Sequence, residues 1–404
     1  MNSELAYEQL EFSEEKSSIK VIFLKHYFFL IPKEELKKIA DFKIAQNSIT
    51  FETESKQSCE RKFNFLVEKY FSELTNVLTK KHAVYIHRNS GIPLMGNTSF
   101  GVVYRNTNMI EVKPVTGCNL DCVYCSIDEG TSSGKKTDFL IEKDYLVEEI
   151  KKLAEFVGAE WNCHIGTHGE PLLYPELVDL ISAVSKIKNL KAISMDTNAV
   201  ILTEEKVDEL VNAGLTRFNV SLDSLDENLA GKMAGCCYNL EHVKKMIMYI
   251  SKKADVLIAP VWVKGWNDGQ MEKLVEFALK NCRGNVKLGI QNFLEYDKGR
   301  TPAKQMSWEE FYDKLKKLEE KCKTKLILKA EDFGIKKAKV LPKPFSKGDV
   351  VKATVMCDGM YGSEKICASG GRSINVFGCD AKKGAVIKVK ILREKHNCFA
   401  GKAV

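Results

Sequence analysis

The sequence feature that most constrains the fold is an alternation of short apolar segments with amphipathic segments between residues 110 and 293. In the amphipathic segments Leu, Val and Ile recur every three or four residues, which is typical of helices packed on a sheet. Six such units predict an α/β chain with a partial, open, TIM-like (β/α)6 barrel whose active site lies at the carboxyl ends of the strands. The expected strands are 110–117, 161–169, 191–198, 217–223, 255–263 and 287–293, and the clearest helices are 141–157, 174–187, 203–214 and 239–253.

Two regions flank this core, so we expect three domains. Residues 1–109 mix apolar strand-like and helical patterns and predict an α+β domain of unassigned role. The barrel core is expected over 110–335, and two prolines and a glycine then mark a linker at 339–349. Residues 345–404 contain five short strand-like segments punctuated by glycines, which indicates a small β-barrel.

Composition indicates the compartment. The 404 residues are 44% hydrophobic, no apolar run is long enough to span a bilayer, and the N-terminus has no signal-peptide pattern. Thirteen cysteines in a chain of this length indicate reduced thiols or metal ligands rather than a disulfide framework. We therefore expect a cytoplasmic protein with no membrane partner, while nothing in the sequence predicts its oligomeric state.

Three cysteines with C-x3-C-x2-C spacing directly follow the first expected strand. Cys118, Cys122 and Cys125 therefore belong to a loop at the carboxyl edge of the barrel, where α/β barrels place their chemistry. Three thiolates can hold three irons of a [4Fe-4S] cluster and leave the fourth iron open. The alternative is a zinc site that a remote Cys or His completes.

The stretch "CNLDCVYC" resembles the signature of the radical S-adenosylmethionine (radical SAM) superfamily, and later motifs follow in the expected order. "HGEP" resembles the family's GGEP motif, except that His168 stands in place of the first glycine. The resemblance implies that Gly169 and Glu170 bind the methionine amino group of SAM and that Tyr124 lies near the adenine. It also implies that polar residues at the third and fourth strand ends line the SAM carboxylate and ribose, namely Thr197, Asn198, Ser221 and Asp223.

Each of these residues also has a structural interpretation. Tyr124 could serve only in packing, Glu170 could be a helix-start carboxylate, and Ser221 with Asp223 could form a turn. Their occurrence at four successive strand ends favours the cofactor site. Longer stretches, such as "GIPLMGNTSFGVVYRNTNMIEVKPVTG" and "VLIAPVWVKGWND", resemble archaeal radical SAM proteins of poorly defined role.

The resemblance implies a [4Fe-4S] cluster and SAM as cofactors. In this family an electron from the reduced cluster cleaves SAM to a 5'-deoxyadenosyl radical, which then abstracts hydrogen from a substrate. An electron donor such as a ferredoxin or flavodoxin is then a required partner. The resemblance does not settle the substrate.

The C-terminal region is similar to a TRAM domain, an OB-like barrel found on RNA-modifying enzymes. Residues 341–404 hold twelve Lys and Arg and five Asp and Glu, and this excess equals the formal net charge of +7 of the whole chain. Such a barrel suits a polyanion, because basic side chains neutralise phosphates, although any one lysine is more often part of a solvated face. Phe377 and Phe399 are possible stacking groups. The candidate RNA contacts are Lys352, Arg372, Lys382, Lys383, Lys388, Lys390, Arg393 and Lys395.

Three functions compete. The leading one is a radical SAM enzyme that modifies RNA, either tRNA or rRNA, by a reaction such as methylation or methylthiolation. The second is a radical SAM enzyme acting on a protein or peptide, with tail cysteines such as Cys357 and Cys367 holding an auxiliary cluster. The third is a non-enzymatic RNA-binding zinc protein. Because only Cys59 precedes Cys118, the chain lacks the three upstream cysteines of two-cluster methylthiotransferases.

Overall fold

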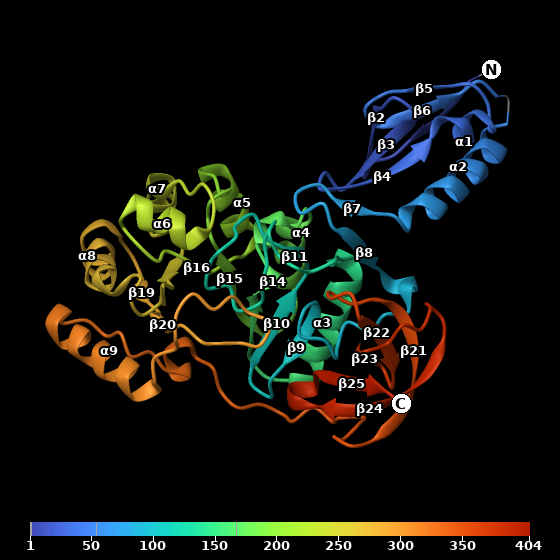
Figure 1. Cartoon of the computed structure of the whole chain (residues 1–404). Coiled ribbons are helices and arrows are strands. Elements are labelled where there is room, and N and C mark those ends of the chain that lie inside the picture. Colours follow the sequence, from blue (N-terminus) through green and yellow to red (C-terminus); the bar gives the residue numbers. More distant parts are fainter. Residues whose placement is uncertain (1, 54, 167) are drawn as a thin grey trace. The chain divides into compact units, whose positions relative to one another are not determined.

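The computed structural model describes residues 2–53, 55–166 and 168–404. The chain forms two compact units (Figure 1). The first contains the chain up to Tyr85 together with Lys136–Leu140, and the second contains Ile86–Lys135 and Ile141–Val404. Among the described residues, no helix is both long and apolar enough to cross a membrane. The division at 109/110 and 335/345 that the sequence suggests stays a prediction.

The first unit is an α+β structure, and its sheets are ordered β12-β8-β7-β4-β3-β2 and β1-β6-β5. The hairpin of β3 and β4 alternates buried and part-exposed residues, and Leu24 and Lys25 turn it with φ of 49° and 65°. The strands are β1 Ser3–Ala6, β2 Leu10–Glu14, β3 Ser18–Phe23, β4 Tyr27–Pro32, β5 Phe42–Ile44, β6 Ser48–Phe51, β7 Thr75–Asn76, β8 His82–Ile86 and β12 Thr137–Ile141, and the helices are α1 Lys33–Lys37 and α2 Lys56–Phe71.

The core of the second unit is an open seven-stranded sheet in the order β19-β17-β16-β15-β13-β10-β9. The six strands from β10 to β19 are parallel, which confirms the six predicted βα units and the partial barrel. β9 joins the edge antiparallel to β10, and the sequence patterns did not indicate this addition. The strands are β9 Gly101–Tyr104, β10 Met109–Lys113, β13 Trp161–Ile165, β15 Leu190–Thr197, β16 Arg217–Val220, β17 Asp255–Ile258 and β19 Val286–Leu288.

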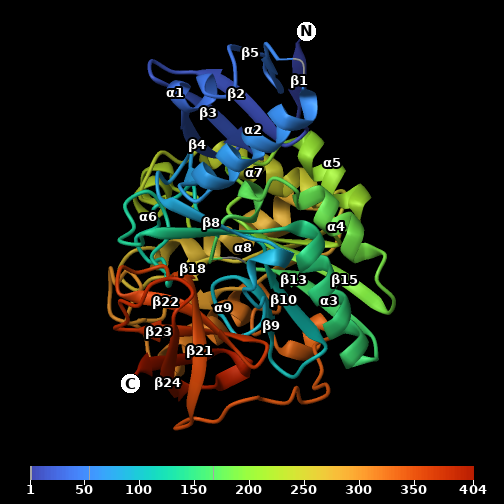
Figure 2. The ribbon, with the colours of Figure 1, turned by 90° about the vertical axis from the view of Figure 1, so that its right-hand side faces the viewer.

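Short strands continue four of these strands at their carboxyl ends. β11 (Thr116–Gly117) pairs with β14 (His168–Gly169), and β18 (Val261–Trp262) pairs with β20 (Gln291–Asn292). Amphipathic helices cover the outside of the barrel (Figure 2), as the hydrophobic spacing predicted. Each buries its apolar face, as in α3, α7 and α8. They are α3 Lys143–Val157, α4 Leu177–Ser185, α5 Glu204–Ala213, α6 Glu227–Ala234, α7 Leu240–Ile250, α8 Met271–Asn281 and α9 Trp308–Cys322, with short 3-10 turns η1 Arg88–Ser90, η2 Pro171–Leu173, η3 Asp268–Gln270 and η4 Ala330–Phe333.

The C-terminal segment of the second unit is a small closed barrel in the order β21-β22-β23-β25-β24. β23 and β25 are parallel and the other neighbours antiparallel, which is the strand arrangement of a five-stranded Greek-key barrel of the OB type. All five predicted strand segments are present. They are β21 Val350–Asp358, β22 Glu364–Ser369, β23 Arg372–Phe377, β24 Val386–Arg393 and β25 Phe399–Ala403, with η5 Lys395–Asn397 before the last strand.

Backbone hydrogen bonds join this small barrel to the core. The amide of Ser373 donates to the Met95 carbonyl over 2.9 Å, and the amide of Phe399 donates to the Gly96 carbonyl over 2.8 Å. Gly96 has a φ of 121°, and a Cβ there would lie 2.2 Å from the Ser373 carbonyl oxygen. The close approach of the two backbones therefore requires glycine at this position.

Candidate active site

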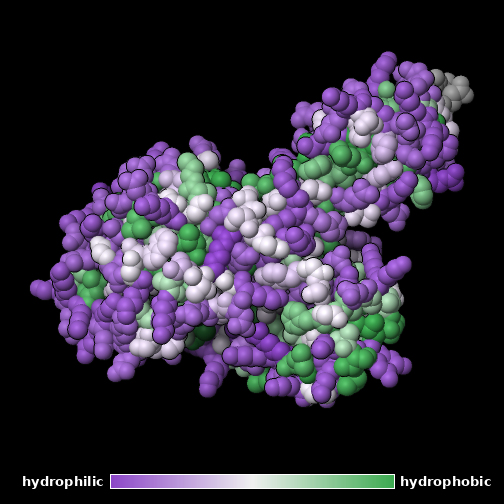
Figure 3. All heavy atoms as spheres, in the orientation of Figure 1, coloured by the Kyte–Doolittle hydropathy of each residue, from purple (hydrophilic) through white to green (hydrophobic). Residues whose placement is uncertain are grey.

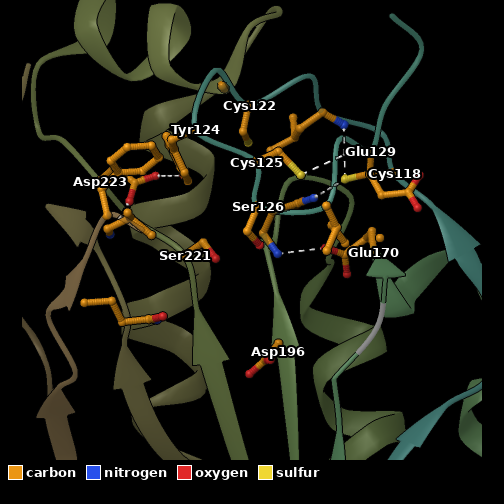
Figure 4. Close-up of a pocket in the computed structure, with 18 of the residues that line it drawn as sticks. Cys118, Cys122, Tyr124, Cys125, Ser126, Glu129, Glu170, Asp196, Ser221 and Asp223 are labelled. Atoms are coloured by element: carbon orange, nitrogen blue, oxygen red, sulfur yellow. Dashed lines mark hydrogen bonds between the residues drawn. The ribbon is translucent and has the colours of Figure 1, made fainter. Parts of the chain in front are cut away.

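A cavity of about 310 Å³ lies at the carboxyl ends of the core strands (Figure 4). Its size falls in the usual range for a small-molecule site. The structure brings together in this one cavity all ten residues that the sequence motifs predicted for a cluster and SAM, which come from four segments of the chain. They are Cys118, Cys122, Tyr124, Cys125, Gly169, Glu170, Thr197, Asn198, Ser221 and Asp223.

The three cysteines lie on the loop that follows β11. The amide of Leu120 donates to Cys118 Sγ over 3.4 Å, and the amide of Glu129 donates to Cys125 Sγ over 3.3 Å. Burial raises the pKa of Cys118 well above its ordinary value and that of Cys122 to about 12. Without a metal these two thiols therefore stay protonated and are poor nucleophiles, whereas metal coordination would deprotonate them.

This donor set fits a cluster better than a single ion. In the part of the chain that the structure describes, no three His, Cys, Asp or Glu side chains form a group that could hold one metal ion. A cubic cluster binds each thiolate at a different iron, so its ligands do not converge on one point. The three soft thiols around a cavity thus match a [4Fe-4S] cluster with one open iron.

Arg300 holds the cysteine loop in place, although it is distant in sequence. Its backbone amide donates to the Cys125 carbonyl over 2.9 Å, and its Nη1 donates to the Cys122 carbonyl over 3.2 Å. Nε and Nη2 reach carboxylate oxygens of Asp128 and Asp121 at 2.8 and 3.2 Å. No local pattern indicated a role for Arg300, because its partners lie at least 168 residues earlier.

Glu170 is buried at the cavity wall and is fully engaged by hydrogen bonds. Its Oε1 accepts from Thr197 Oγ1 over 2.8 Å and from the amide of Leu172 over 3.1 Å, and its Oε2 accepts from the amide of Asn198 over 2.8 Å. Burial raises the pKa of Glu170 to about 7, although these donors oppose the shift. The carboxyl group can therefore gain or lose a proton near neutral pH.

The neighbouring Gly169 lies where two backbones meet. Its φ is 138°, and a Cβ would lie 1.9 Å from the carbonyl oxygen of Gly117 on the paired strand β11. The amide of Glu170 also donates to that carbonyl over 2.9 Å. The glycine of the motif thus allows the Glu170 strand to approach the cysteine-bearing strand.

Tyr124 and Asp223 form a pair on the opposite wall. The Tyr124 hydroxyl donates to Asp223 Oδ2, and the amide of Val261 donates to Asp223 Oδ1 over 2.8 Å. Burial raises the pKa of Asp223 to about 6 and keeps that of Tyr124 well above its ordinary value. Ser221 lines the cavity between this pair and Thr197, whose carbonyl accepts from the Ser221 amide over 3.0 Å.

The sequence motifs did not indicate Asn119, which lies beside the cavity, or Asp196, which is part of its lining. Asn198 Nδ2 donates to Asn119 Oδ1 over 2.8 Å, which ties the third strand end to the cysteine loop. Asp196 also lines the cavity, with its Oδ2 3.2 Å from His164 Nε2 inside the barrel. The alternation of side-chain direction along β15 could have predicted that Asp196 lies inside the barrel, but no sequence motif distinguished it from its neighbours.

The eight predicted RNA contacts are not brought to one place. Lys352 and Lys388 are direct cross-strand partners, and Lys390 pairs in the same way with Lys402, so these lysines share the exposed face of β21, β24 and β25. Burial lowers the pKa of Arg372, whose Nη1 donates to the Gly371 carbonyl over 3.1 Å. The rest lie elsewhere: Lys382 and Lys383 in the loop before β24, Lys395 in η5, and Arg393 at a second cavity.

A partial parallel barrel with three thiols in a cavity at its carboxyl edge is the architecture of an α/β enzyme. The Radical SAM superfamily pattern matches residues 112–278 of the chain. An uncharacterized protein of Methanocaldococcus jannaschii is 35% identical over 370 residues, which cover 84% of this chain and 85% of that protein. The chain belongs to the radical SAM superfamily, and its cofactors are S-adenosylmethionine and a [4Fe-4S] cluster.

Other relatives match a smaller part. GTP 3',8-cyclase of Clostridium botulinum is 33% identical over 181 residues, covering 44% of this chain and 54% of that protein. A probable GTP 3',8-cyclase of Archaeoglobus fulgidus is 32% identical over 197 residues, covering 48% and 60%. The chain thus spans little more than half the length of these cyclases.

Two solved structures show partial likeness. TYW1 with a bound lysine-pyruvate adduct is 20% identical with a TM-score of 0.41, covering 57% of this chain and 78% of that chain. Streptococcus suis SuiB bound to S-adenosylmethionine is 14% identical with a TM-score of 0.42, covering 79% and 70%. These values assign no activity to the present chain.

Proposed function

We propose that the chain is a radical SAM enzyme that modifies RNA, either tRNA or rRNA. The observation that carries the RNA assignment is the lysine face of the small barrel, formed by Lys352, Lys388, Lys390 and Lys402. Like charges directly opposite on neighbouring strands destabilise a sheet. Across the described ranges none of these four lysines has an acidic partner within 4 Å, so the charge is free to neutralise phosphates.

In this proposal Cys118, Cys122 and Cys125 hold the cluster. When bound, the reduced cluster supplies the electron that cleaves SAM to the radical that attacks the substrate. A ferredoxin or flavodoxin would provide that electron. The thirteen cysteines, which are free throughout the described residues, support a reducing, cytoplasmic location.

The chain's own residues would bind and orient SAM. Glu170 is held by Thr197 and Asn198 at a position where its ionised carboxylate can accept hydrogen bonds from an ammonium group. The Tyr124–Asp223 pair fixes the tyrosine ring at the opposite wall, where it would contact the adenine. Ser221 and Asn198 line the part of the cavity where the carboxylate or ribose would lie, and the bond from Asn198 to Asn119 fixes the Asn198 side chain there. These roles make binding of SAM dependent on both walls of the cavity.

A second candidate substrate is a free purine nucleotide. The identity of 33% with a GTP 3',8-cyclase over 44% of the chain favours it. This candidate uses the same cofactor site but gives no role to the lysine face. A protein or peptide substrate is the third candidate, and it likewise leaves that face without a ligand.

The experiment that separates these functions is a product assay on the anaerobically reconstituted protein with SAM and dithionite. RNA isolated from a strain lacking the gene should raise production of 5'-deoxyadenosine, and mass spectrometry of its nucleosides should then show a mass change. The variant Lys352→Gln/Lys388→Gln/Lys390→Gln should lose this stimulation but keep the basal rate. The matched variant Lys152→Gln/Lys206→Gln/Lys244→Gln removes three lysines that lie on helices and form ion pairs there. It should behave as wild type. Stimulation by GTP or peptide alone, with RNA inert, would refute the RNA assignment.

A further inference from the structure

A second cavity, of about 330 Å³, lies between the core and the small barrel within the second unit. We call it the junction cavity. It shares Ser126 and Ile127 with the cofactor cavity, so the two spaces adjoin at the cysteine loop. Its wall on the small barrel includes Tyr361 and Phe377, and its wall on the core includes His168. A molecule held there would lie beside the cofactors.

Two aromatic rings of the junction cavity are covered by one cation. Lys298 Nζ lies 3.9 Å from the centroid of the Tyr361 ring and 4.8 Å from that of Phe377. Each ring therefore turns towards Lys298 rather than packing wholly in the barrel core, and Phe377 is 36% exposed. Lys298 belongs to the loop after β20 and could leave the rings, because an exposed cation–π contact is weak compared with stacking of a base.

The position of these rings within the small barrel is that of a ligand-binding face. In OB-type barrels the second and third strands and the loops after the first and fourth strands bind oligonucleotides. Here Tyr361 lies in the loop after the first strand of the barrel, Phe377 ends the third strand, and Arg393 ends the fourth strand. This face looks onto the core, whereas the lysine face lies on β21, β24 and β25. In Figure 3, hydrophobic residues gather over the small barrel, and the exposed Val350, Val386 and Leu392 lie on the side of the lysine face rather than at the junction cavity.

His168 adds a polar group without a partner. Within the described ranges its buried Nδ1 atom has no hydrogen-bond partner. His168 lines the junction cavity, while the next two residues, Gly169 and Glu170, line the cofactor cavity. His168 is also the residue that departs from the glycine of the family motif. The departure therefore supplies a hydrogen-bonding group to the junction cavity and not to the SAM side.

We propose that the junction cavity binds a single unstacked nucleobase of the RNA substrate, with Tyr361 and Phe377 as the stacking rings and His168 as a hydrogen-bonding group. This inference rests on the proposed RNA modification and names the place where the modified or a neighbouring nucleotide is held. The base displaces Lys298, whose ammonium then contacts a phosphate. Arg393 supplies a second cation at the same cavity, and among the described residues it has no acidic partner within 4 Å. Asp297 and Glu364 also line the cavity, but across the described residues neither is ion-paired with Lys298 or Arg393, and two such cations favour a nucleotide over an aromatic side chain of a peptide.

The test uses the full-length, anaerobically reconstituted protein and a single-stranded RNA octamer that carries one 2-aminopurine. Stacking on the rings quenches this base, so wild-type protein should lower its fluorescence. Tyr361→Leu/Phe377→Leu should abolish the quenching and weaken binding on the order of 5- to 150-fold, the usual value of one stacked base. His168→Ala should weaken binding of the octamer while the quenching remains. Trp308→Leu/Tyr312→Leu is the matched control, because it removes two exposed, stacked rings of α9 that line neither cavity.

Lys298→Gln provides a second reading that does not depend on the rings. It should reduce the slope of log affinity against log salt concentration by about the amount expected for one phosphate contact. If wild-type protein binds no RNA, the proposed function itself fails. If it binds RNA with unchanged affinity and quenching in Tyr361→Leu/Phe377→Leu, the junction-cavity proposal is overturned while RNA modification stands. Tyr361-dependent binding of a tryptophan-containing peptide, with no quenching by RNA, would assign the cavity to a peptide instead.

Discussion

Replacing Gly169 by alanine should destabilise the second unit strongly. The new Cβ would lie 1.9, 2.5 and 2.8 Å from the backbone O, C and N atoms of Gly117, so no side-chain movement can relieve the overlap. The φ of 138° adds a backbone penalty of about 1–3 kcal/mol, and forced overlap adds a similar amount. We therefore expect the free energy of unfolding to fall by about 2–6 kcal/mol.

Alanine variants of two other glycines separate the backbone penalty from the steric overlap. Gly265 has a φ of 84°, and an alanine Cβ there would have no atom within 4 Å, so its alanine variant carries only the backbone penalty of about 1–2 kcal/mol. Gly269 has open space and an ordinary φ, and its alanine variant should stay within about 0.5 kcal/mol of wild type. Urea unfolding of the cluster-free protein, followed by tryptophan fluorescence, measures the free energy of unfolding of all three alanine variants. The four tryptophans lie in the second unit, so the signal reports that unit alone. If Gly169→Ala is no worse than Gly265→Ala, the close approach of the two strands is not what requires glycine.

Three further outcomes are expected. Because burial raises the pKa of Glu170 to about 7, SAM should bind the reconstituted protein about tenfold more weakly at pH 6 than at pH 8. Equilibrium dialysis measures this affinity, and in Glu170→Gln the affinity should not change with pH. A steep pH dependence in the variant would exclude Glu170 as the titrating group. Burial is the largest single influence on the pKa of His164 and lowers it, but the charge and hydrogen bond of Asp196 together with the charge of Glu111 outweigh burial, so the net pKa lies above 6.5. The stability that the pair contributes is therefore complete below pH 6.5 and is lost as the pH rises through the raised pKa. The urea midpoint of cluster-free protein should therefore fall from pH 6 to pH 9, less so in His164→Gln, and equal slopes would contradict this. Arg300→Lys keeps the charge but loses the planar set of donors to the cysteine loop. Iron per chain after anaerobic reconstitution should therefore fall to roughly half, and Arg61→Lys in the first unit is the control. Full iron content in Arg300→Lys would show that Arg300 does not support the cluster.

Local sequence patterns were sufficient for most of the fold. The six parallel strands and the five strands of the small barrel were predictable because each buries residues at a regular period and ends at glycine, proline or a polar turn. β9 was missed because Gly101–Tyr104 is a four-residue segment whose pairing with β10 is visible only in three dimensions. Its residues are all buried, so its sequence has no alternation to read.

The candidate site was predictable where chemistry depends on spacing within one segment. The three cysteines, Gly169 and Glu170 lie in such motifs, and one cavity now contains them. Arg300 and Lys298 were not predictable, because their partners are distant in sequence and an exposed basic residue is usually only solvated. The lysines of the small barrel were predicted as one group by composition, but strand geometry distributes them over several surfaces.

The backbone junction at Met95 and Gly96 has a consequence for substrate choice. Because the small barrel is hydrogen-bonded to the core through Ser373 and Phe399, the span from its lysine face to the cysteine loop is set by the fold rather than by a flexible tether. An RNA bound at that face would then have its contacted phosphates at a fixed distance from the cofactors. Nucleotides at one fixed spacing from the contacted phosphates would reach the cofactors, so selection would follow from length along the RNA as well as from the identity of the base.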